Sequence, residues 1–255
     1  MRCASAWPIQ AAGSDGLLDN RQGRLDSAGS LTLDGVVLDN RGGALSSAGD
    51  LEVRSAAALD NAGGVIETDA ALSLHSARLD NRDGGRITAQ GTAHITTGAL
   101  DNSQGGLVGS AAHLQLLAGQ VTNQAGGSIG GKTVDASVLG LAQQGGELFS
   151  QGRLTLDLNH GDLDNRDGLL HGAGPLTLLN LRDVANQRGE ISSTQGFELR
   201  ARNLDTRDGK VLSSQGLTLR IVEQLDAARG LISARTLNLQ AASLNNRDGV
   251  IGSRE

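Results

Sequence analysis

The sequence predicts an all-β protein: a right-handed parallel β-helix, or β-solenoid, of about twelve rungs with three short strands in each rung. Three observations predict this fold. The phrase Leu-Asp-Asn, as at residues 79–81, recurs in exact or weaker form every 19 to 22 residues. One glycine keeps a fixed place in every copy, and each copy contains a short alternation such as Leu51-Glu52-Val53. A period this regular is typical of a repeat architecture.

The repeat region covers residues 18–255, and we expect it to form one domain, while residues 1–17 form a non-repeat N-terminal segment. The twelve copies begin at residues 18, 38, 59, 79, 100, 121, 141, 163, 184, 204, 225 and 244. Alternation over so short a run indicates a strand with one buried face. Three such strands cannot build a core alone, so each must pair in parallel with its counterpart one repeat on. The right-handed preference of parallel crossovers predicts the hand of the coil.

A glycine stands five residues after the leading aliphatic residue in all twelve copies. Glycine supplies a positive φ or lets two stretches of backbone approach closely, so we predict a structural turn at each of these positions. The predicted turn glycines are Gly23, Gly43, Gly64, Gly84, Gly105, Gly126, Gly146, Gly168, Gly189, Gly209, Gly230 and Gly249.

The third residue of the phrase is asparagine in nine of the twelve copies. Alternation points the leucine inward, the aspartate outward and the asparagine inward at a corner of the coil. A buried amide is costly unless its hydrogen-bonding groups are satisfied, and stacked amides satisfy one another. We therefore predict a structural ladder of Asn20, Asn40, Asn61, Asn81, Asn102, Asn123, Asn165, Asn186 and Asn246.

The outward aspartates of neighbouring rungs would repel one another without intervening positive charge. Arginines two residues beyond the aspartate position supply it in half of the copies: Arg21, Arg41, Arg82, Arg166, Arg207 and Arg247. Exposed pairs of this kind are individually weak. An ion site between stacked aspartates remains an alternative interpretation of the same pattern.

Composition excludes several classes of protein. The net charge of −6 argues against nucleic acid as a partner, and no apolar run is long enough to insert into a membrane. Residues 1–10 lack the pattern of a signal peptide. With Cys3 as the only cysteine, no internal disulfide forms, and the aromatic residues number only three: Trp7, Phe149 and Phe197.

No motif indicates an enzyme, a cofactor or a metal site. The run Asp80-Asn81-Arg82-Asp83-Gly84 fails as an EF-hand calcium loop, since arginine takes the third position and Gly91 the twelfth. The five histidines occupy different phases of the repeat and do not converge as metal ligands. A polysaccharide-binding or polysaccharide-cleaving β-helix would interrupt its repeat locally, and the spacing leaves little room for that. A leucine-rich-repeat interaction protein shares the period but places its asparagine differently.

The pattern Leu-Asp-Asn-x-x-Gly-x-Ile-x-Ser-x-Gly-x-Leu-x-Leu resembles the haemagglutinin repeat of filamentous haemagglutinins and of related contact-dependent growth-inhibition effectors. The resemblance covers residues 18–255. It implies a shaft segment of a long, secreted, cell-surface adhesin of Gram-negative bacteria. The parent would be exported by an outer-membrane two-partner-secretion transporter and would meet host cells or neighbouring bacteria through other regions. A shaft for delivering a growth-inhibition toxin is the alternative.

Two departures from the full-length family pattern follow from the sequence. It shows neither a secretion domain nor a toxin or receptor-binding segment, so we expect a fragment of a longer shaft. The last rung is incomplete, and an unpaired parallel edge predicts end-to-end self-association.

Overall fold

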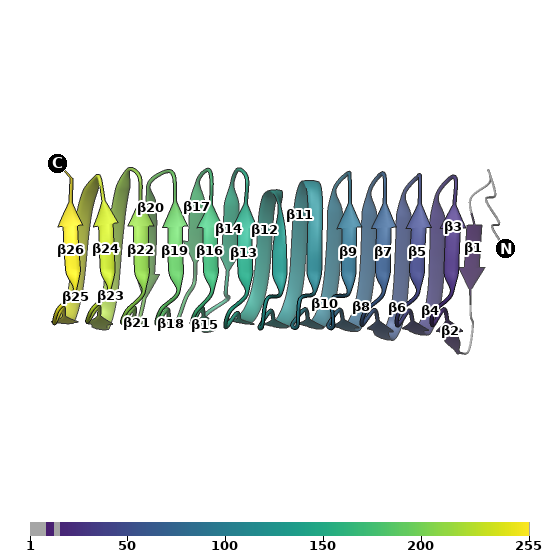
Figure 1. Cartoon of the computed structure of the whole chain (residues 1–255), viewed down its shortest axis with the longest axis horizontal. Coiled ribbons are helices and arrows are strands. Elements are labelled where there is room, and N and C mark those ends of the chain that lie inside the picture. The colour runs from purple at the N-terminus through teal and green to yellow at the C-terminus, as the bar shows by residue number, and fades with distance from the viewer. Residues whose placement is uncertain (1–8, 13–15, 255) are drawn as a thin grey trace.

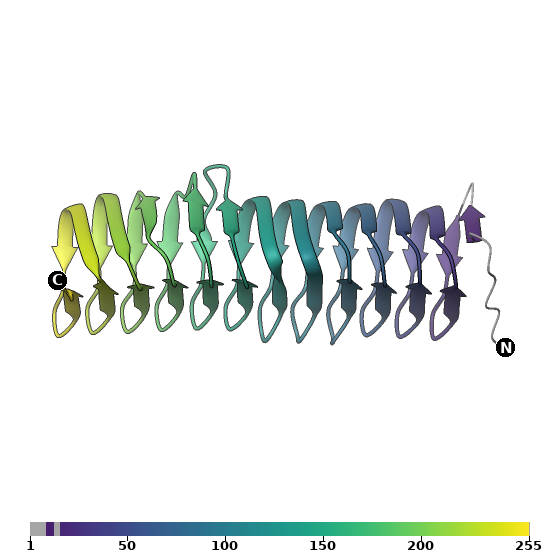
Figure 2. The same ribbon diagram turned by 90° about the horizontal axis from the view of Figure 1, so that it is seen from above.

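The chain forms a single coil of parallel strands with about eleven turns (Figure 1). The structure is a computed structural model, and it describes residues 9–12 and 16–254. Every strand in these ranges belongs to one sheet, and they contain no helix, hence none that could span a membrane. The predicted all-β solenoid is confirmed. The turns follow one another along the long axis, so the molecule is a rod (Figure 2). Cys3 and Trp7 lie outside the described residues.

Most turns of the coil contain a short strand, a bend and a longer strand that ends in the Leu-Asp-Asn corner. The short strands are β3 (Arg24–Ser27), β5 (Ala44–Ser47), β7 (Val65–Thr68), β9 (Arg86–Ala89), β13 (Glu147–Ser150), β16 (Leu169–Gly172), β19 (Glu190–Ser193), β22 (Lys210–Ser213), β24 (Leu231–Ala234) and β26 (Val250–Ser253). The longer strands are β4 (Leu31–Asp39), β6 (Leu51–Asp60), β8 (Leu72–Asp80), β10 (Ala93–Asp101), β23 (Gly216–Asp226) and β25 (Thr236–Asn245).

The number of strands in a turn varies along the rod, whereas we predicted three throughout. Two turns run as one continuous strand each, β11 (Leu107–Thr122) and β12 (Ser128–Ala142). Three others divide the longer strand into a pair: β14 (Leu154–Asp157) with β15 (Leu163–Asp164), β17 (Leu176–Leu179) with β18 (Asp183–Ala185), and β20 (Phe197–Ala201) with β21 (Asn203–Asp205). The bends between predicted strands are therefore gentle enough in most turns for the pairing to continue through them.

Each strand pairs in parallel with its counterpart one turn away, and equivalent residues of the repeat face one another. Leu51 pairs with Leu72, Leu59 with Leu79, and Ile66 with Ile87. A slip of one residue would turn the apolar side chains outward, so the alternation pins the register.

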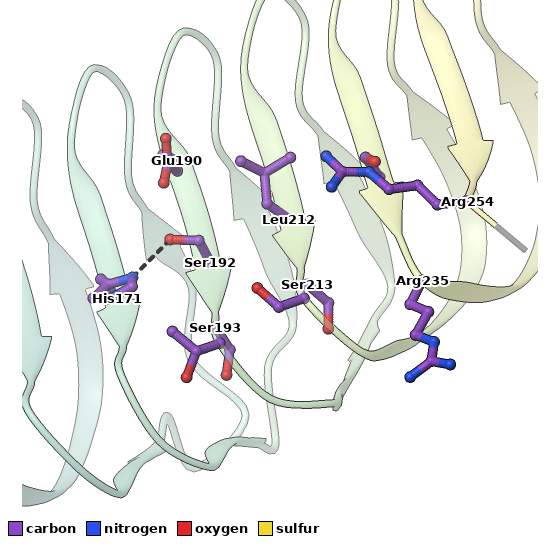
Figure 3. A pocket seen from close by; sticks show the side chains of 11 residues that line it. His171, Glu190, Ser192, Ser193, Leu212, Ser213, Arg235 and Arg254 are labelled. Carbon is purple, nitrogen blue, oxygen red and sulfur yellow. Dashed lines mark hydrogen bonds between the residues drawn. The ribbon is translucent and has the colours of Figure 1, made fainter.

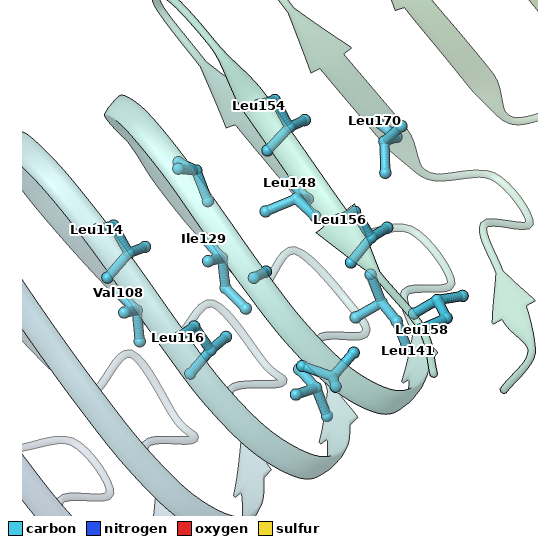
Figure 4. Packing of buried hydrophobic residues seen from close by; sticks show 14 of the residues in the cluster. Val108, Leu114, Leu116, Ile129, Leu141, Leu148, Leu154, Leu156, Leu158 and Leu170 are labelled. Atoms are coloured by element: carbon cyan, nitrogen blue, oxygen red, sulfur yellow. The ribbon is translucent and has the colours of Figure 1, made fainter. Parts of the chain in front are cut away.

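The core is a column of aliphatic side chains with about four from each turn. In one turn, Leu51, Val53, Leu59 and Ile66 are each at most 1% exposed. Figure 4 shows the same arrangement at mid-rod, where Leu114 and Leu116 of β11 point inward together with Val108 from the start of the same strand. Each buried aliphatic side chain contributes roughly 1.5–3 kcal/mol, while ordering one residue's backbone costs roughly 1–2 kcal/mol. A single turn is therefore not stable alone, and stability comes from stacking.

The coil begins earlier than the predicted boundary at residue 18. The strand β1 (Ile9–Ala12) pairs in parallel with residues 31–34 of β4, and β2 (Leu17–Asp19) pairs with the end of the same strand. The described part of residues 1–17 thus adds strands to the solenoid. The sequence of this segment gives no sign of these strands, because it contains no Leu-x-Leu alternation.

Candidate functional site

The recurring corner is built from the end of a long strand and the turn that follows it. At residues 79–81, Leu79 and Asn81 are fully buried, while Asp80 lies at the rim and is 8% exposed. The Asn81 side-chain nitrogen donates to Oδ1 of Asn102 at 2.7 Å and to the carbonyl oxygen of Leu107 at 3.1 Å. Its own Oδ1 accepts a bond from Asn61 at 2.7 Å. The buried amide therefore has partners in both neighbouring turns.

These amides form one ladder with a fixed direction, in which each turn donates to the next. The ladder runs without a gap from Asn20 to Thr206. Two of its members were not predicted, because neither is asparagine. Gln143 donates to Asn165 at 2.9 Å, and Thr206 accepts from Asn186 at 3.0 Å. Their place in the repeat, two residues after the leading aliphatic residue, is the signal that could have identified them.

The ladder stops at Ala227, whose side chain can neither accept a bond from Thr206 nor donate one to Asn246. Asn246, in the next turn, was predicted as a ladder member, but its Oδ1 is buried and accepts no hydrogen bond. Asn246 is thus separated from the eight other predicted asparagines, which are all joined.

The turn glycines are required by close backbone approach. A Cβ on Gly43 would lie 2.1 Å from the carbonyl oxygen of Asn20, and one on Gly146 would lie 1.7 Å from that of Asn123. Both distances are far below van der Waals contact. The positive φ falls on the preceding residue, which need not be glycine: φ is 57° at Arg188 and 60° at Gly42.

Three of the predicted turn glycines meet the requirement through a positive φ and not through close approach. In the turns that follow Asn81, Asn102 and Asn123 the chain holds one extra residue, so Gly84, Gly105 and Gly126 take positive φ and a Cβ on any of them would meet open space. The close approach falls on the glycine that follows each of them: Gly85, Gly106 and Gly127. Paired glycines made the two positions indistinguishable in the sequence.

On the outer side of the corner, arginines and aspartates alternate along the rod. Arg41 contacts Asp39 of its own turn at 2.6 Å and reaches Asp60 of the next turn at 3.5 Å. The side-chain hydrogen bonds from Arg41 hold the pKa of Asp39 below its usual range. In the same way Arg21 lowers the pKa of Asp19 to about 2. Arg82, Arg166 and Arg207 make the same pair in their own turns, whereas Arg247 contacts Asp248.

A second row of charge lies at the positive-φ positions of the C-terminal half and was not predicted. Arg188 pairs with Asp167 of the preceding turn at 2.6 Å, and Arg229 pairs with Asp208 at 2.7 Å. Aspartate and arginine alternate here at a period of one turn. The signal lay in the residue before each turn glycine, which had no assigned role.

The described residues contain no group of three or more His, Cys, Asp or Glu side chains that could hold a metal ion. A hollow of about 490 Å³ lies beside β16, β19 and β22 (Figure 3), where His171 Nδ1 lies 2.9 Å from Ser192 Oγ. No carboxylate in that part of the chain hydrogen-bonds the His171 ring, so the pair is not a catalytic triad. Two other histidines bond to a polar neighbour one turn away: His94 to Gln115 and His113 to Thr133.

A family model of the haemagglutinin repeat matches nearly the whole chain. Its matches cover residues 5–63, 54–104, 93–183, 178–224 and 221–255. The first match begins before residue 18, in agreement with the early start of the coil. Neither a curated protein nor a solved structure matches the chain.

Proposed function

Since the chain belongs to the haemagglutinin-repeat family of the filamentous haemagglutinins, we propose that it is a structural shaft segment of a secreted, cell-surface adhesin. The family in general comprises secreted and cell-surface exoproteins of structural, adhesin type. The segment holds other regions of the parent protein apart and stiffens the shaft between them. Binding of host cells or neighbouring bacteria belongs to other regions of the parent protein, and catalysis plays no part in the role of the segment.

The observation that carries this proposal is the continuity of the corner. Hydrogen bonds join the stacked side chains from Asn20 to Thr206 without a gap, alongside the backbone pairing of every turn. A rod built this way resists bending, because bending separates ladder bonds on one side. It also needs no disulfide or metal to stay folded, which suits export as an extended chain that folds afterwards.

Export through an outer-membrane two-partner-secretion transporter is part of the same proposal. Parallel pairing of each turn with its neighbour favours it, because turns can be added one at a time as the chain emerges. A shaft of this kind also serves delivery of a growth-inhibition toxin. The genes beside this one separate the two roles: a transporter gene supports export in either case, and a small immunity gene downstream identifies toxin delivery.

The shaft role is tested by changing its length. Small-angle scattering of the purified chain should give a rod of about 55 Å, from a spacing of about 4.8 Å per turn. Deleting one whole repeat, residues 59–78, should shorten the rod by about one spacing and leave it folded. A globular scattering profile, or loss of folding on removal of a whole repeat, would contradict the proposal.

A further inference from the structure

The tripeptide Arg-Asp-Gly recurs four times at the turn that follows the ladder residue. In each copy the aspartate takes a positive φ of 55° or 56°: Asp83, Asp167, Asp208 and Asp248. Asp-Gly is the pair at which a protein backbone rearranges most readily, because glycine has no Cβ to hinder attack of its nitrogen on the aspartate carboxyl group. Since the four copies share local sequence and φ, their surroundings decide which of them reacts.

Arginines hold three of these four carboxylates. Arg188, one turn on, donates from two nitrogen atoms to Asp167, both at 2.6 Å. Arg229 donates in the same way to Asp208, both at 2.7 Å. These hydrogen bonds hold the pKa values of both carboxyl groups below their usual range. The guanidinium of the preceding residue lies 3.4 Å from the carboxylate of Asp248. A carboxylate held in this way resists attack, because the nitrogen reacts with the neutral carboxyl form, from which an oxygen can leave as water.

The carboxyl group of Asp83 is the exception. Its side chain is exposed and makes no hydrogen bond or ion pair within the described part of the chain. The equivalent residue one turn on is Gln104, which carries no charge. The neighbouring Arg82 contacts Asp80 at 2.8 Å and reaches Asp101 at 3.6 Å instead. No arginine therefore holds Asp83 as arginines hold the other three.

The backbone of this turn is also held by fewer bonds. The N–H groups of Asp167 and Asp208 each donate to a carbonyl oxygen of the next turn at 3.0 Å, whereas that of Asp83 makes no hydrogen bond within the described residues. Gly84, which supplies the attacking nitrogen, has open space around its Cβ position. One hydrogen bond, from the Gly84 N–H to the Gln104 carbonyl oxygen at 3.0 Å, has to open before the attack. Two glycines in succession give the turn the freedom to open it.

We propose that Asp83 is a site of spontaneous isomerisation to isoaspartate. The nitrogen of Gly84 attacks the side-chain carboxyl carbon of Asp83 and loses its proton, and a carboxyl oxygen leaves as water, which closes a succinimide ring. Water then adds to the main-chain carbonyl carbon of the ring and breaks its bond to the nitrogen. The chain now runs through Cβ of residue 83, and the former main-chain carbonyl group becomes the free carboxylate. One water is lost and one is gained, so no other reactant takes part.

The modification loosens the corner at a defined turn. Isoaspartate lengthens the main chain between Asn81 of the ladder and Gly85, whose Cβ position lies 2.5 Å from the Asn61 carbonyl oxygen. So close an approach leaves no room for a longer chain, and stability should fall with the age of the protein, first at this turn. This inference goes beyond the shaft role, because scattering measures the rod whether or not Asp83 rearranges.

The test is to keep the purified full chain near neutral pH at physiological temperature and to map isoaspartate over time. Enzymatic methylation of isoaspartyl groups followed by peptide mass spectrometry locates each modified residue. Isoaspartate should accumulate at residue 83 severalfold faster than at Asp167 or Asp208, although all three lie in the same tripeptide.

Two reciprocal variants test the cause. Gln104→Arg places a guanidinium beside Asp83 in the way that Arg188 stands beside Asp167, so it should suppress isomerisation at residue 83. Arg188→Ala removes the partner of Asp167 and should bring isoaspartate to that residue. The fold accepts alanine at this place in the repeat, since Ala125 has a φ of 50°.

The matched control is His75→Ala, an exposed residue on a regular strand, which should leave the distribution of isoaspartate unchanged. Circular dichroism of each variant checks that it is folded before the incubation begins. The proposal is overturned if residue 83 forms no isoaspartate, if it forms no more than Asp167 and Asp208 do, or if either reciprocal variant leaves the distribution as it is in the parent chain.

Discussion

The stacked corners form a row along the rod, and two sections of this row differ in their ladder residues. The section from Asn20 to Asn123 has an asparagine in every turn, whereas the section from Thr206 to Asn246 has lost its ladder at Ala227. The backbone is the same in both: the N–H of the turn glycine donates to the carbonyl oxygen of the ladder residue at 2.9 Å in Asn61 and in Ala227. The path of the chain therefore depends on the turn glycine, and the ladder amide stabilises the path that the glycine allows.

The largest effect should come from the glycines, and it should be equal in the two sections. A Cβ would lie 2.2 Å from the Asn40 carbonyl oxygen in Gly64→Ala and 2.4 Å from that of Thr206 in Gly230→Ala. Because backbone atoms cannot move aside, each variant should lose more than about 4 kcal/mol of unfolding free energy or fail to fold. Denaturant melts followed by circular dichroism would measure this.

The control for these variants is Gly84→Asn. Gly84 has a φ of 76° and open space around its Cβ position, and asparagine tolerates that conformation. The variant should cost less than about 1 kcal/mol. If Gly84→Asn were as harmful as Gly64→Ala, the close approach in that turn would not belong to Gly85.

The asparagines should separate the two sections. In Asn81→Leu, the Oδ1 of Asn102 and one donor of Asn61 lose their partner, so the change should cost about 2–4 kcal/mol although leucine is more apolar. In Asn246→Leu no ladder bond is lost, and the cost should stay below about 1 kcal/mol. Equal destabilisation of the two variants would show that the ladder bonds contribute nothing of their own.

Restoring the ladder should have a smaller, stabilising effect. Ala227→Asn would accept a hydrogen bond from Thr206 and donate one to the unpartnered Oδ1 of Asn246, which should add about 1 kcal/mol. Ala227→Leu fills the same space without an amide and should bring no gain. A thermal melt that rises for both variants would mean that volume, not hydrogen bonding, is missing at this position.

The smallest effect should be that of the outer charges, seen as acid sensitivity. Asp39 has a pKa below its usual value, so its contribution is present above the unfolded-state pKa near 3.9 and is lost as pH falls toward its lower folded-state pKa. Stability should therefore decline below about pH 4. Asp39→Asn should flatten this decline while changing stability at pH 7 by less than about 1 kcal/mol.

Arg41→Ala removes the partner that lowers the Asp39 pKa, so it should flatten the same decline in stability at acid pH. A decline below pH 4 that is unchanged in both variants would assign the acid sensitivity to other carboxylates.

Much of the corner was predictable because its period repeats twelve times within one chain. Leu79, Asn81 and their counterparts repeat at one phase, so alternation alone assigns them to the interior. The sequence did not separate the positive-φ glycine from the close-approach glycine in pairs such as Gly84-Gly85. At residues 9–12 no alternation marks the strand. Gln143 and Thr206 were not predicted as ladder members, because the prediction included only asparagine and not every side chain with a polar end.

By itself, the sequence determined the fold class, the direction in which each apolar side chain points and the existence of a buried amide row, because these follow from local alternation and a fixed period. Only the tertiary structure decided which glycine meets the neighbouring carbonyl and that the loop at residues 158–161 leaves the row of turns. Those features depend on distances between turns about 20 residues apart, and a linear sequence holds no measure of them.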